Sequence, residues 1–186
     1  MPISFEATSI AEVILVKPHT IGDSRGWFRE MFKAAPYAEA GIATMFVQDN
    51  ASHSERGVLR GLHFQRDPHA QGKLVSVVHG EVFDVAVDIR VGSPTFGNWV
   101  GEYLSAENGY QLWIPAGFAH GFCVTAASAT LSYKVTAPYS AVSDGGIRWN
   151  DPAIGVSWPV SDPVLSPKDE VQPFLAESDH GFQYSF

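Results

Sequence analysis

The chain has 186 residues, of which 45% are hydrophobic and 17% are charged, a balance that excludes an intrinsically disordered protein. This length fits one domain with a substantial buried core. The net charge of −8 provides no global basic field to attract nucleic acid or an anionic membrane, so an anionic ligand requires a local cluster of Arg and Lys.

Three further features of the sequence bear on location. Cys123 is the only cysteine, which excludes a disulfide within the chain, and its apolar neighbours indicate a buried small side chain. The N-terminal residues MPISFEATSI show no basic region followed by an apolar core, so we expect no secretory signal. No apolar run approaches the roughly 18 residues of a membrane span. We therefore expect a soluble cytoplasmic protein.

The first part of the chain predicts strands and one short helix. Strands are expected over residues 12–17 and 43–48, with a polar stretch following at 48–53. The stretch 23–32 is expected to begin with a turn at residues 24–26 and to continue as an aromatic strand. The only plausible helix covers residues 34–40 and is stopped by Gly41.

From residue 58 onward the β signal is nearly continuous. Turns rich in Gly and Pro separate the expected strands, and such regular spacing indicates a sandwich, barrel or jelly roll rather than βαβ units. The expected strands cover residues 58–65, 73–79, 81–90, 98–104, 111–114, 121–125 and 129–137.

The clearest alternation lies in residues 82–89. Successive side chains of a strand point to opposite faces, so Asp84 and Asp88 share one face with small residues, while bulky apolar residues share the other. This pattern suits a barrel with a polar cavity, although two carboxylates that simply face solvent fit the pattern equally well. After Pro138 no period is sustained, so we expect residues 138–186 to wrap the barrel within a single domain spanning residues 1–186.

Two histidines occupy places reminiscent of the metal motifs of barrel proteins. His63 is followed by Phe64 and Gln65 where a second histidine and a glutamate would be needed, and His120 follows a Pro-Ala-Gly turn. A catalytic divalent metal usually has three protein ligands. We therefore expect no metal and no cofactor.

Without a metal, His63 becomes a candidate general base and Lys73 a fixed positive charge. A lone strand histidine is more often structural, but here it stands with Arg60, Gln65 and Lys73 among leucines and valines, unlike a solvated charge run. Strict alternation places Arg60 and His63 on opposite faces, so both reach one pocket only if the strand bulges, which we expect at Gly61. Tyr133 on its own would be read as core packing.

Four long motifs resemble the dTDP-4-dehydrorhamnose 3,5-epimerase family of the cupin superfamily. They are QDNASHSERGVLRGLHFQ, QGKLVSVVHGEVFDVAVDIR, LWIPAGFAHGF and GIRWNDPAIGVSWP, and the likeness runs from about residue 18 to about residue 173. The resemblance implies an all-β cupin-type jelly-roll barrel (a double-stranded β-helix) with minor short helices. It also implies a metal-independent homodimer that epimerises a dTDP-linked 4-keto-6-deoxyhexose on the way to dTDP-rhamnose, with no nucleic-acid or membrane partner.

The resemblance also implies roles for individual residues. His63 would be the general base oriented by Asp169, Tyr133 the acid on the opposite face, and Lys73 the cation beside the keto oxygen. The N-terminal segment would reach the partner subunit. Residues expected to contact the sugar, diphosphate or nucleotide are Arg25, Glu30, Gln48, Asp49, Asn50, Arg60, His120, Tyr139, Asp144 and Lys168. Two positions depart from the family pattern: Asp144 stands where many members have glutamate, and Ser76 stands where an arginine is common.

Two alternatives remain open at this point. A relative that inverts only one carbon would share the base, the acid and the lysine. A non-catalytic cupin that binds a sugar nucleotide would need neither base nor acid, so the joint presence of His63, Lys73 and Tyr133 argues against it. A metal-dependent cupin oxygenase is weaker still, for want of ligands.

Overall fold

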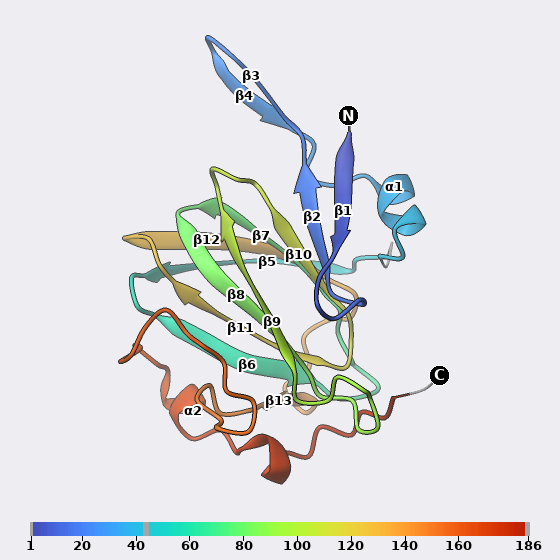
Figure 1. Ribbon diagram of the computed structural model, residues 1–186, viewed down its shortest axis with the longest axis vertical. Helices are drawn as coiled ribbons and strands as arrows, with labels where there is room; N and C mark the ends of the chain where they lie inside the picture. The colour runs from blue at the N-terminus through green and yellow to red at the C-terminus, as the bar shows by residue number, and fades with distance from the viewer. Residues whose placement is uncertain (1, 43–44, 185–186) are drawn as a thin grey trace.

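The computed structural model describes residues 2–42 and 45–184, and two antiparallel sheets dominate it (Figure 1). One sheet has six strands in the order β1-β2-β10-β7-β12-β5, and the other has five in the order β13-β6-β11-β8-β9. The six are β1 (Ile3–Ala7), β2 (Ile14–Pro18), β10 (Gln111–Ile114), β7 (Lys73–His79), β12 (Ser128–Val135) and β5 (Gln48–Glu55). The five are β13 (Asp144–Gly146), β6 (Leu59–Gln65), β11 (Phe118–Val124), β8 (Glu81–Asp88) and β9 (Trp99–Ser105).

The chain passes back and forth between the two sheets. β6 lies in the five-stranded sheet, β7 in the six-stranded sheet and β8 in the five-stranded sheet again; β10, β11 and β12 alternate in the same way. This path winds the chain as a jelly roll, which confirms the all-β fold expected from the sequence.

Strands β6 to β12 lie where the sequence predicted them, to within about three residues at each end, whereas β13 lies in the segment expected to be irregular. The turn expected at residues 24–26 is present and leads into strand β4 (Gly26–Arg29), which is shorter than expected and pairs in a hairpin with β3 (Thr20–Asp23), a strand that the sequence did not predict. Two other expectations nearer the N-terminus are wrong, and one further strand was missed. The polar stretch expected at 48–53 is strand β5, and the short strand β1 was missed. Of the strand expected over 43–48, residues 43–44 lie outside the described residues and 45–47 form no strand.

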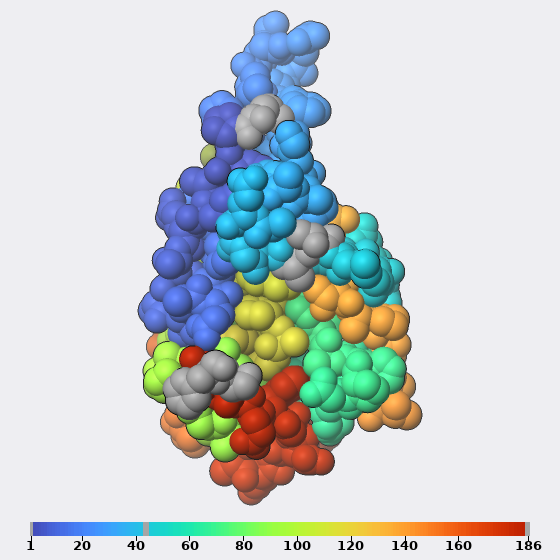
Figure 2. Space-filling view, turned by 90° about the vertical axis from the view of Figure 1, so that its right-hand side faces the viewer, coloured from blue at the N-terminus to red at the C-terminus, as the bar shows by residue number. Residues whose placement is uncertain are grey.

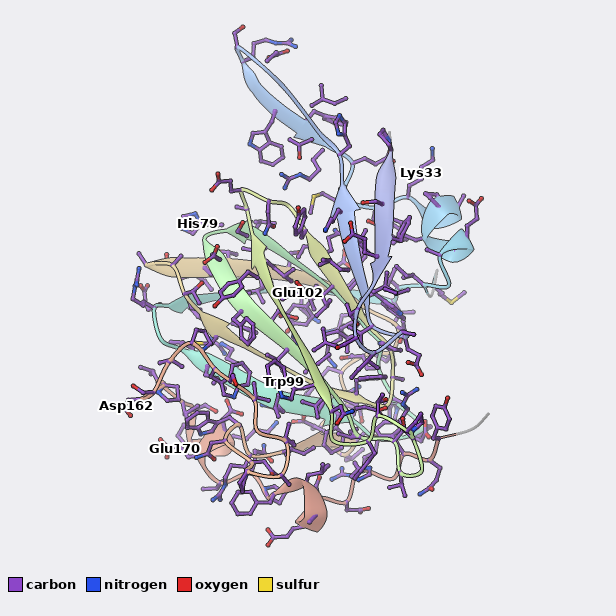
Figure 3. All side chains as sticks on the ribbon, viewed as in Figure 1. Lys33, His79, Trp99, Glu102, Asp162 and Glu170 are labelled. Carbon is purple, nitrogen blue, oxygen red and sulfur yellow. The ribbon has the colours of Figure 1, made fainter. Side chains whose placement is uncertain are left out.

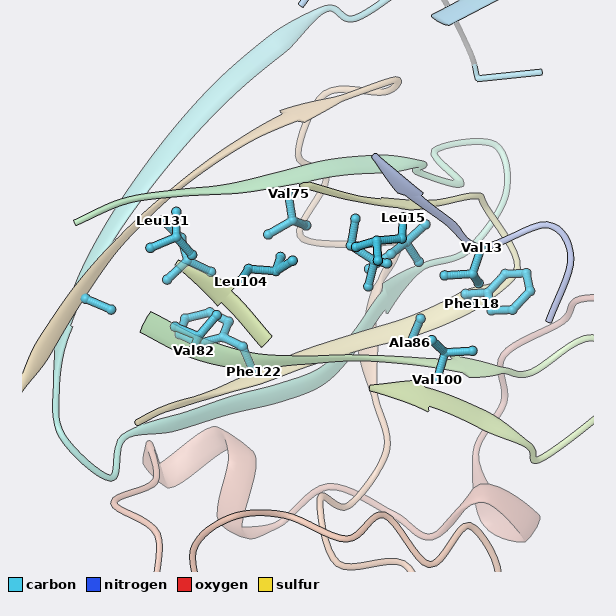
Figure 4. Close-up of a cluster of buried hydrophobic side chains, with 14 of the residues drawn as sticks. Val13, Leu15, Val75, Val82, Ala86, Val100, Leu104, Phe118, Phe122 and Leu131 are labelled. Carbon is cyan, nitrogen blue, oxygen red and sulfur yellow. The ribbon is translucent and has the colours of Figure 1, made fainter. Parts of the chain in front are cut away.

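An apolar core fills one half of the space between the sheets (Figure 4). It includes Leu15 of β2, Val75 of β7, Val82 of β8 and Leu131 of β12. Burial of such side chains supplies roughly 25 cal/mol per Å² of apolar area removed from water. The other half of the interior remains polar.

The two faces of β8 are both buried. Asp84 and Asp88 lie fully buried on the inner face, so the alternative in which they face solvent is wrong. The outer face packs against apolar side chains from the later part of the chain, including Ile147, Ile154 and Leu175. The segment after residue 138 therefore covers the outer side of the five-stranded sheet, and Figure 1 shows it below that sheet.

The outer side of the six-stranded sheet is partly covered by helix α1 (Ala34–Glu39). Tyr37 packs there with Trp113 and other apolar residues, and its hydroxyl donates to Gln111 Oε1 at 2.6 Å. Figure 2 shows α1, in light blue, lying against the body of the molecule. The remaining helices are α2 (Pro167–Glu170) and the 3₁₀ turn η1 (Leu175–Glu177). No helix in the described ranges has the length and apolar character needed to cross a membrane.

The β3–β4 hairpin projects from one end of the molecule, with its side chains standing apart from the other elements (Figures 1 and 3). Trp27 and Phe28 are 64% and 65% exposed on it. Its base is fixed by Arg29, which donates to Thr20 Oγ1 at 2.6 Å and to the Glu107 carbonyl at 3.1 Å. The hairpin is thus an anchored arm with exposed aromatic side chains.

Candidate active site

A cavity of about 420 Å³ opens into the polar half of the interior, between the two sheets. A smaller one of about 180 Å³ adjoins it, since both are lined by His63, Lys73 and Tyr133. The larger is also lined by Gln48, Asn50, Phe64, Gln65, Gln71, Tyr139, Asp144 and Lys168; the smaller adds Ser52, Arg60, His120 and Phe122.

His63 is held by a buried carboxylate behind it. Its Nε2 lies 2.5 Å from Asp169 Oδ1, which belongs to helix α2. Asp169 is itself fixed by Ser166, whose hydroxyl donates to Oδ2 at 2.9 Å. Although burial acts to raise the pKa of Asp169, the hydrogen bond from His63 and the nearby positive charges hold it below its usual value. An ionised Asp169 fixes one ring nitrogen of His63 and leaves the other available for proton transfer.

The register shift expected at Gly61 is present. β11 pairs His120 with His63 but Phe122 with Arg60, so β6 has one extra residue between these pairs. The backbones approach so closely that a Cβ on Gly61 would lie 2.5 Å from the Gly121 Cα. This bulge brings Arg60 and His63 to the same side of the strand, where both line the smaller cavity.

Lys73 is a buried cation at the start of β7. Burial lowers the pKa of its ammonium group to about 8, while the negative charges of Asp144 and Asp84 act to raise it. An ammonium group in this position stays protonated around neutral pH and is directed at the cavity rather than at bulk water. It can stabilise negative charge that develops on a bound molecule.

Tyr133 lies on the inner face of β12, with Leu131 and Val135 on the same face. Burial raises the pKa of its phenol, and Arg60 partly opposes this shift. The phenol therefore remains protonated at neutral pH and can donate a proton. His63 as a candidate base, Lys73 as a cation and Tyr133 as a candidate acid therefore line the same two adjoining cavities.

Polar side chains at the mouth of the larger cavity are tied to one another. Asp144 accepts from Lys168 and, at 3.3 Å, from the Tyr139 hydroxyl. Gln48 Oε1 accepts from the Tyr139 backbone N–H at 3.0 Å, and its amide donates to Asn50 Oδ1 at 2.7 Å. Gln48 therefore supports the segment that carries Tyr139, in addition to lining the cavity.

Four of the residues expected at the site do not line either cavity, and one of them, Asp169, stands behind His63. Asp49 alternates to the outer face of β5 and pairs with Lys134 at 3.0 Å. Arg25 stands at the tip of the projecting hairpin, paired with Asp23 at 2.5 Å. Glu30 follows the hairpin, and its Oε1 is buried with no hydrogen-bond partner among the described residues.

Two residues without an assigned role contribute to the site: Gln65, which the sequence groups with Arg60, His63 and Lys73, and Asp84. Gln65 donates to the carbonyls of His69 and Pro138 at 2.8 and 3.1 Å and accepts from the Ser140 N–H at 2.7 Å, so it frames the segment of Tyr139. Its place two residues after His63 on the same strand was the available signal. Asp84 accepts from His120 Nε2 at 2.9 Å, and its inner-face position was visible in the alternation of β8.

The described residues contain no group of three or more His, Cys, Asp or Glu side chains arranged to hold a metal ion. The histidines of the site are instead each committed to one carboxylate. The arrangement can accept a proton, donate a proton and stabilise an anion.

Comparisons with known proteins agree with this chemistry. The family model described as dTDP-4-dehydrorhamnose 3,5-epimerase matches residues 7–177. The dTDP-4-dehydrorhamnose 3,5-epimerase of Sinorhizobium fredii is 55% identical over 182 residues, which cover 97% of this chain and 93% of the relative. That of Shigella flexneri is 56% identical over 163 residues, covering 87% and 90%.

A solved structure gives the same result for the fold. The dTDP-6-deoxy-D-glucose-3,5-epimerase of Legionella pneumophila, in complex with dTDP-4-keto-L-rhamnose, superimposes with a TM-score of 0.95 at 50% identity and covers 100% of both chains. The jelly roll is therefore of the cupin type, as the sequence motifs implied. This chain belongs to the dTDP-4-dehydrorhamnose 3,5-epimerase family.

Proposed function

We propose that this protein inverts carbons 3 and 5 of dTDP-4-dehydro-6-deoxy-D-glucose to give dTDP-4-dehydro-L-rhamnose, a step of dTDP-rhamnose biosynthesis. The observation that carries the proposal is the His63–Asp169 pair, which faces one cavity together with Lys73 and Tyr133. A protein that only bound a sugar nucleotide would need no base beside an acid.

Each inversion requires a proton to leave one face of the sugar ring and return to the other. His63 accepts the proton from the carbon beside the ketone, and Asp169 stabilises the imidazolium that forms. The electron pair moves onto the keto oxygen as an enolate, where the Lys73 ammonium stabilises it. Tyr133 then donates its proton to the carbon from the opposite face, which completes the inversion.

Local cations suit the diphosphate of such a substrate in a protein of net charge −8. We assign Arg60 and Lys168 to this role, since they line the smaller and the larger cavity. The exposed ring of Tyr139 at the mouth suits stacking on the thymine base. Asn50, Gln48, Asp144 and His120 complete the polar lining around the sugar and nucleotide.

We further propose that the active form is a homodimer in which the β3–β4 hairpin reaches the partner subunit. Its exposed Trp27 and Phe28 are apolar surface that a partner would bury. In that arrangement Arg25 and Glu30 would contact the nucleotide bound to the partner, which accounts for their distance from the cavity of their own subunit. We expect this enzyme to act in the cytoplasm.

Proton NMR of the purified protein with dTDP-4-dehydro-6-deoxy-D-glucose in deuterated water tests the proposal. Exchange at both ring positions, with a product reducible to dTDP-rhamnose, is the expected result. Exchange at only one position would indicate a single-site epimerase, and dTDP binding without exchange would indicate a binding protein. His63→Ala should abolish turnover yet still bind dTDP, and substantial retained turnover would contradict the assignment of the base.

A further inference from the structure

Two histidine–carboxylate pairs lie side by side in this barrel, and only one of them has a role so far. His63 of β6 and His120 of β11 are direct cross-strand partners. Each has its Nε2 held by a buried carboxylate, at 2.5 Å from Asp169 and at 2.9 Å from Asp84. The second carboxylate comes from the centre of β8, behind the smaller cavity.

Asp84 is an unusual group to find in a protein interior. Its side chain is fully buried, and one of its oxygens, Oδ1, has no hydrogen-bond partner in the described part of the chain. A buried carboxylate normally has its lone pairs satisfied or its charge compensated by a nearby cation. The hydrogen bond from His120 satisfies only Oδ2.

Lys73 lines the smaller cavity together with His120, the residue that holds Asp84, and the negative charges of Asp144 and Asp84 act to raise its pKa. Among the described residues its ammonium group makes no hydrogen bond or ion pair, and its side chain is buried, so it depends on nearby charge to remain protonated. The titratable and charged groups that share its surroundings come from every neighbouring element: Arg60 and His63 of β6, Asp84 of β8, His120 of β11, Tyr133 of β12, Asp144 of β13 and Lys168 of α2.

Only two of these groups are carboxylates, and they differ in how their charge is used. Asp144 also acts to raise the pKa of Lys73, but it lies at the mouth of the cavity and already pairs with Lys168. Asp84 lies behind the cavity, is locked in place by His120, and is out of reach of an incoming substrate. Its charge therefore acts on Lys73 in the free enzyme and in the complex alike.

We propose that Asp84 is a positioning residue of the epimerase, which supplies the fixed counter-charge that keeps the Lys73 ammonium protonated for enolate stabilisation. This inference rests on the proposed function for its catalytic meaning. His120 has a second task in this scheme, because its N–H orients the carboxylate. In this scheme Asp169 orients the base, His63, and Asp84 keeps the cation, Lys73, protonated.

The pH dependence of solvent-deuterium exchange into the substrate tests the proposal with Asp84→Asn. Turnover of the wild-type enzyme should decline above about pH 8 as Lys73 loses its proton. In Asp84→Asn this decline should move to lower pH by at least about half a pH unit, because one charge that favours the ammonium form is gone. A decline at unchanged pH in the folded variant would overturn the proposal.

Asp88→Asn is the matched control. Asp88 lies on the same strand and the same inner face and is equally buried, but its carboxylate bonds to Arg90, Ser93 and Thr95 and is not among the charges that act on Lys73. It should lower the melting temperature without moving the alkaline decline. If it moved the decline as far as Asp84→Asn does, the effect would be a general consequence of loosening β8, and the proposal would be wrong.

A second pair of measurements keeps the test independent of folding and of turnover. The guanidinium of Lys73→Arg stays charged at all pH values used. Adding Asp84→Asn to Lys73→Arg should therefore leave the pH of the alkaline decline in residual activity unchanged. NMR titration of the lysine side chains of the wild-type protein, with Lys73→Arg to identify the signal, should show Lys73 protonated at pH 7. If Lys73 instead lost its proton below about pH 7, the proposed role of Asp84 as its counter-charge would be refuted, and this result does not require Asp84→Asn to fold. Absence of deuterium exchange in the wild type would instead refute the proposed function, and the lysine titration would still decide the inference.

Discussion

Replacing Asp169 by asparagine changes the site by a single atom, and the surrounding hydrogen bonds decide how the new amide sits. Ser166 donates its hydroxyl proton to Oδ2 at 2.9 Å, so the amide oxygen is favoured at that position. The amide nitrogen then takes the place of Oδ1, 2.5 Å from His63 Nε2. Because an amide N–H can only donate, His63 must present a lone pair at Nε2 and carry its proton on the other nitrogen, where the base function is lost.

The size of the effect follows from two contributions. Loss of a charge-assisted hydrogen bond to the imidazolium costs about 1.5–3 kcal/mol, which corresponds to roughly a 10- to 150-fold loss of rate. The wrong tautomer adds to this, and the same change in the triad of a serine protease lowers kcat by about 10⁴. We therefore expect Asp169→Asn to lose about 10³- to 10⁴-fold in kcat for deuterium exchange, with dTDP affinity unchanged.

The double variant Ser166→Ala, Asp169→Asn gives a sharper test of this reasoning. Without the Ser166 hydroxyl the amide is free to turn and offer its oxygen to His63, so part of the lost activity should return. The single variant Ser166→Ala should lose about 1 kcal/mol of stability, since Ser166 caps helix α2, and little activity. Retention of more than about one fifth of wild-type turnover by Asp169→Asn would refute the assigned role of the carboxylate.

Three other predictions follow from the geometry. Tyr133→Phe should reduce formation of inverted product by about 10²- to 10⁴-fold. Deuterium exchange should continue, because His63 can return a proton to the face from which it was removed. An equal loss of exchange, measured by NMR, would contradict separate acid and base roles. Gly61→Ala should leave little folded protein, because the added Cβ would lie 2.5 Å from the Gly121 Cα and the backbone φ is +136°; a melting temperature within a few degrees of wild type would be the contrary result. Burial acts to raise the pKa of Asp88, but hydrogen bonds, first of all that from Arg90, hold it below its usual value. The ionised carboxylate therefore stabilises the fold above about pH 4, and this stabilisation is lost as the pH falls further. The melting temperature should drop more steeply below about pH 4 in the wild type than in Asp88→Asn, and equal slopes would exclude this contribution.

The sequence predicted the strands of the barrel well because their period is strict and glycines mark most turns. The alternation in β8 placed Asp84 and Asp88 on one face, and the conflict between Arg60 and His63 located the bulge at Gly61. These are local features, since each depends on neighbours within a few residues.

What the sequence could not provide is the result of long-range packing. The first strand, β1, was missed although Ile3 and Phe5 alternate with Ser4 and Glu6, because a run of five residues is too short to indicate a strand without its pairing with β2. Nor does the spacing of residues reveal that Gln65 frames the Tyr139 segment, or that Asp84 accepts from His120, since each contact joins distant parts of the chain. The pairing of His63 with Asp169 was implied by family resemblance rather than by any pattern in the residues.

The covering segment after residue 138 has a consequence for how the enzyme matures. His63 and Asp169 are 106 residues apart in the chain, and the second belongs to a segment that packs on the outside of the five-stranded sheet. The strands that build the two sheets all precede residue 147, so they can pair before the covering segment has packed, whereas the His63–Asp169 pair forms only once that segment is in place. During refolding, the β-sheet circular dichroism should therefore recover before catalytic turnover, and a newly made chain would remain inactive until the segment that carries Asp169 had left the ribosome and packed on the sheet.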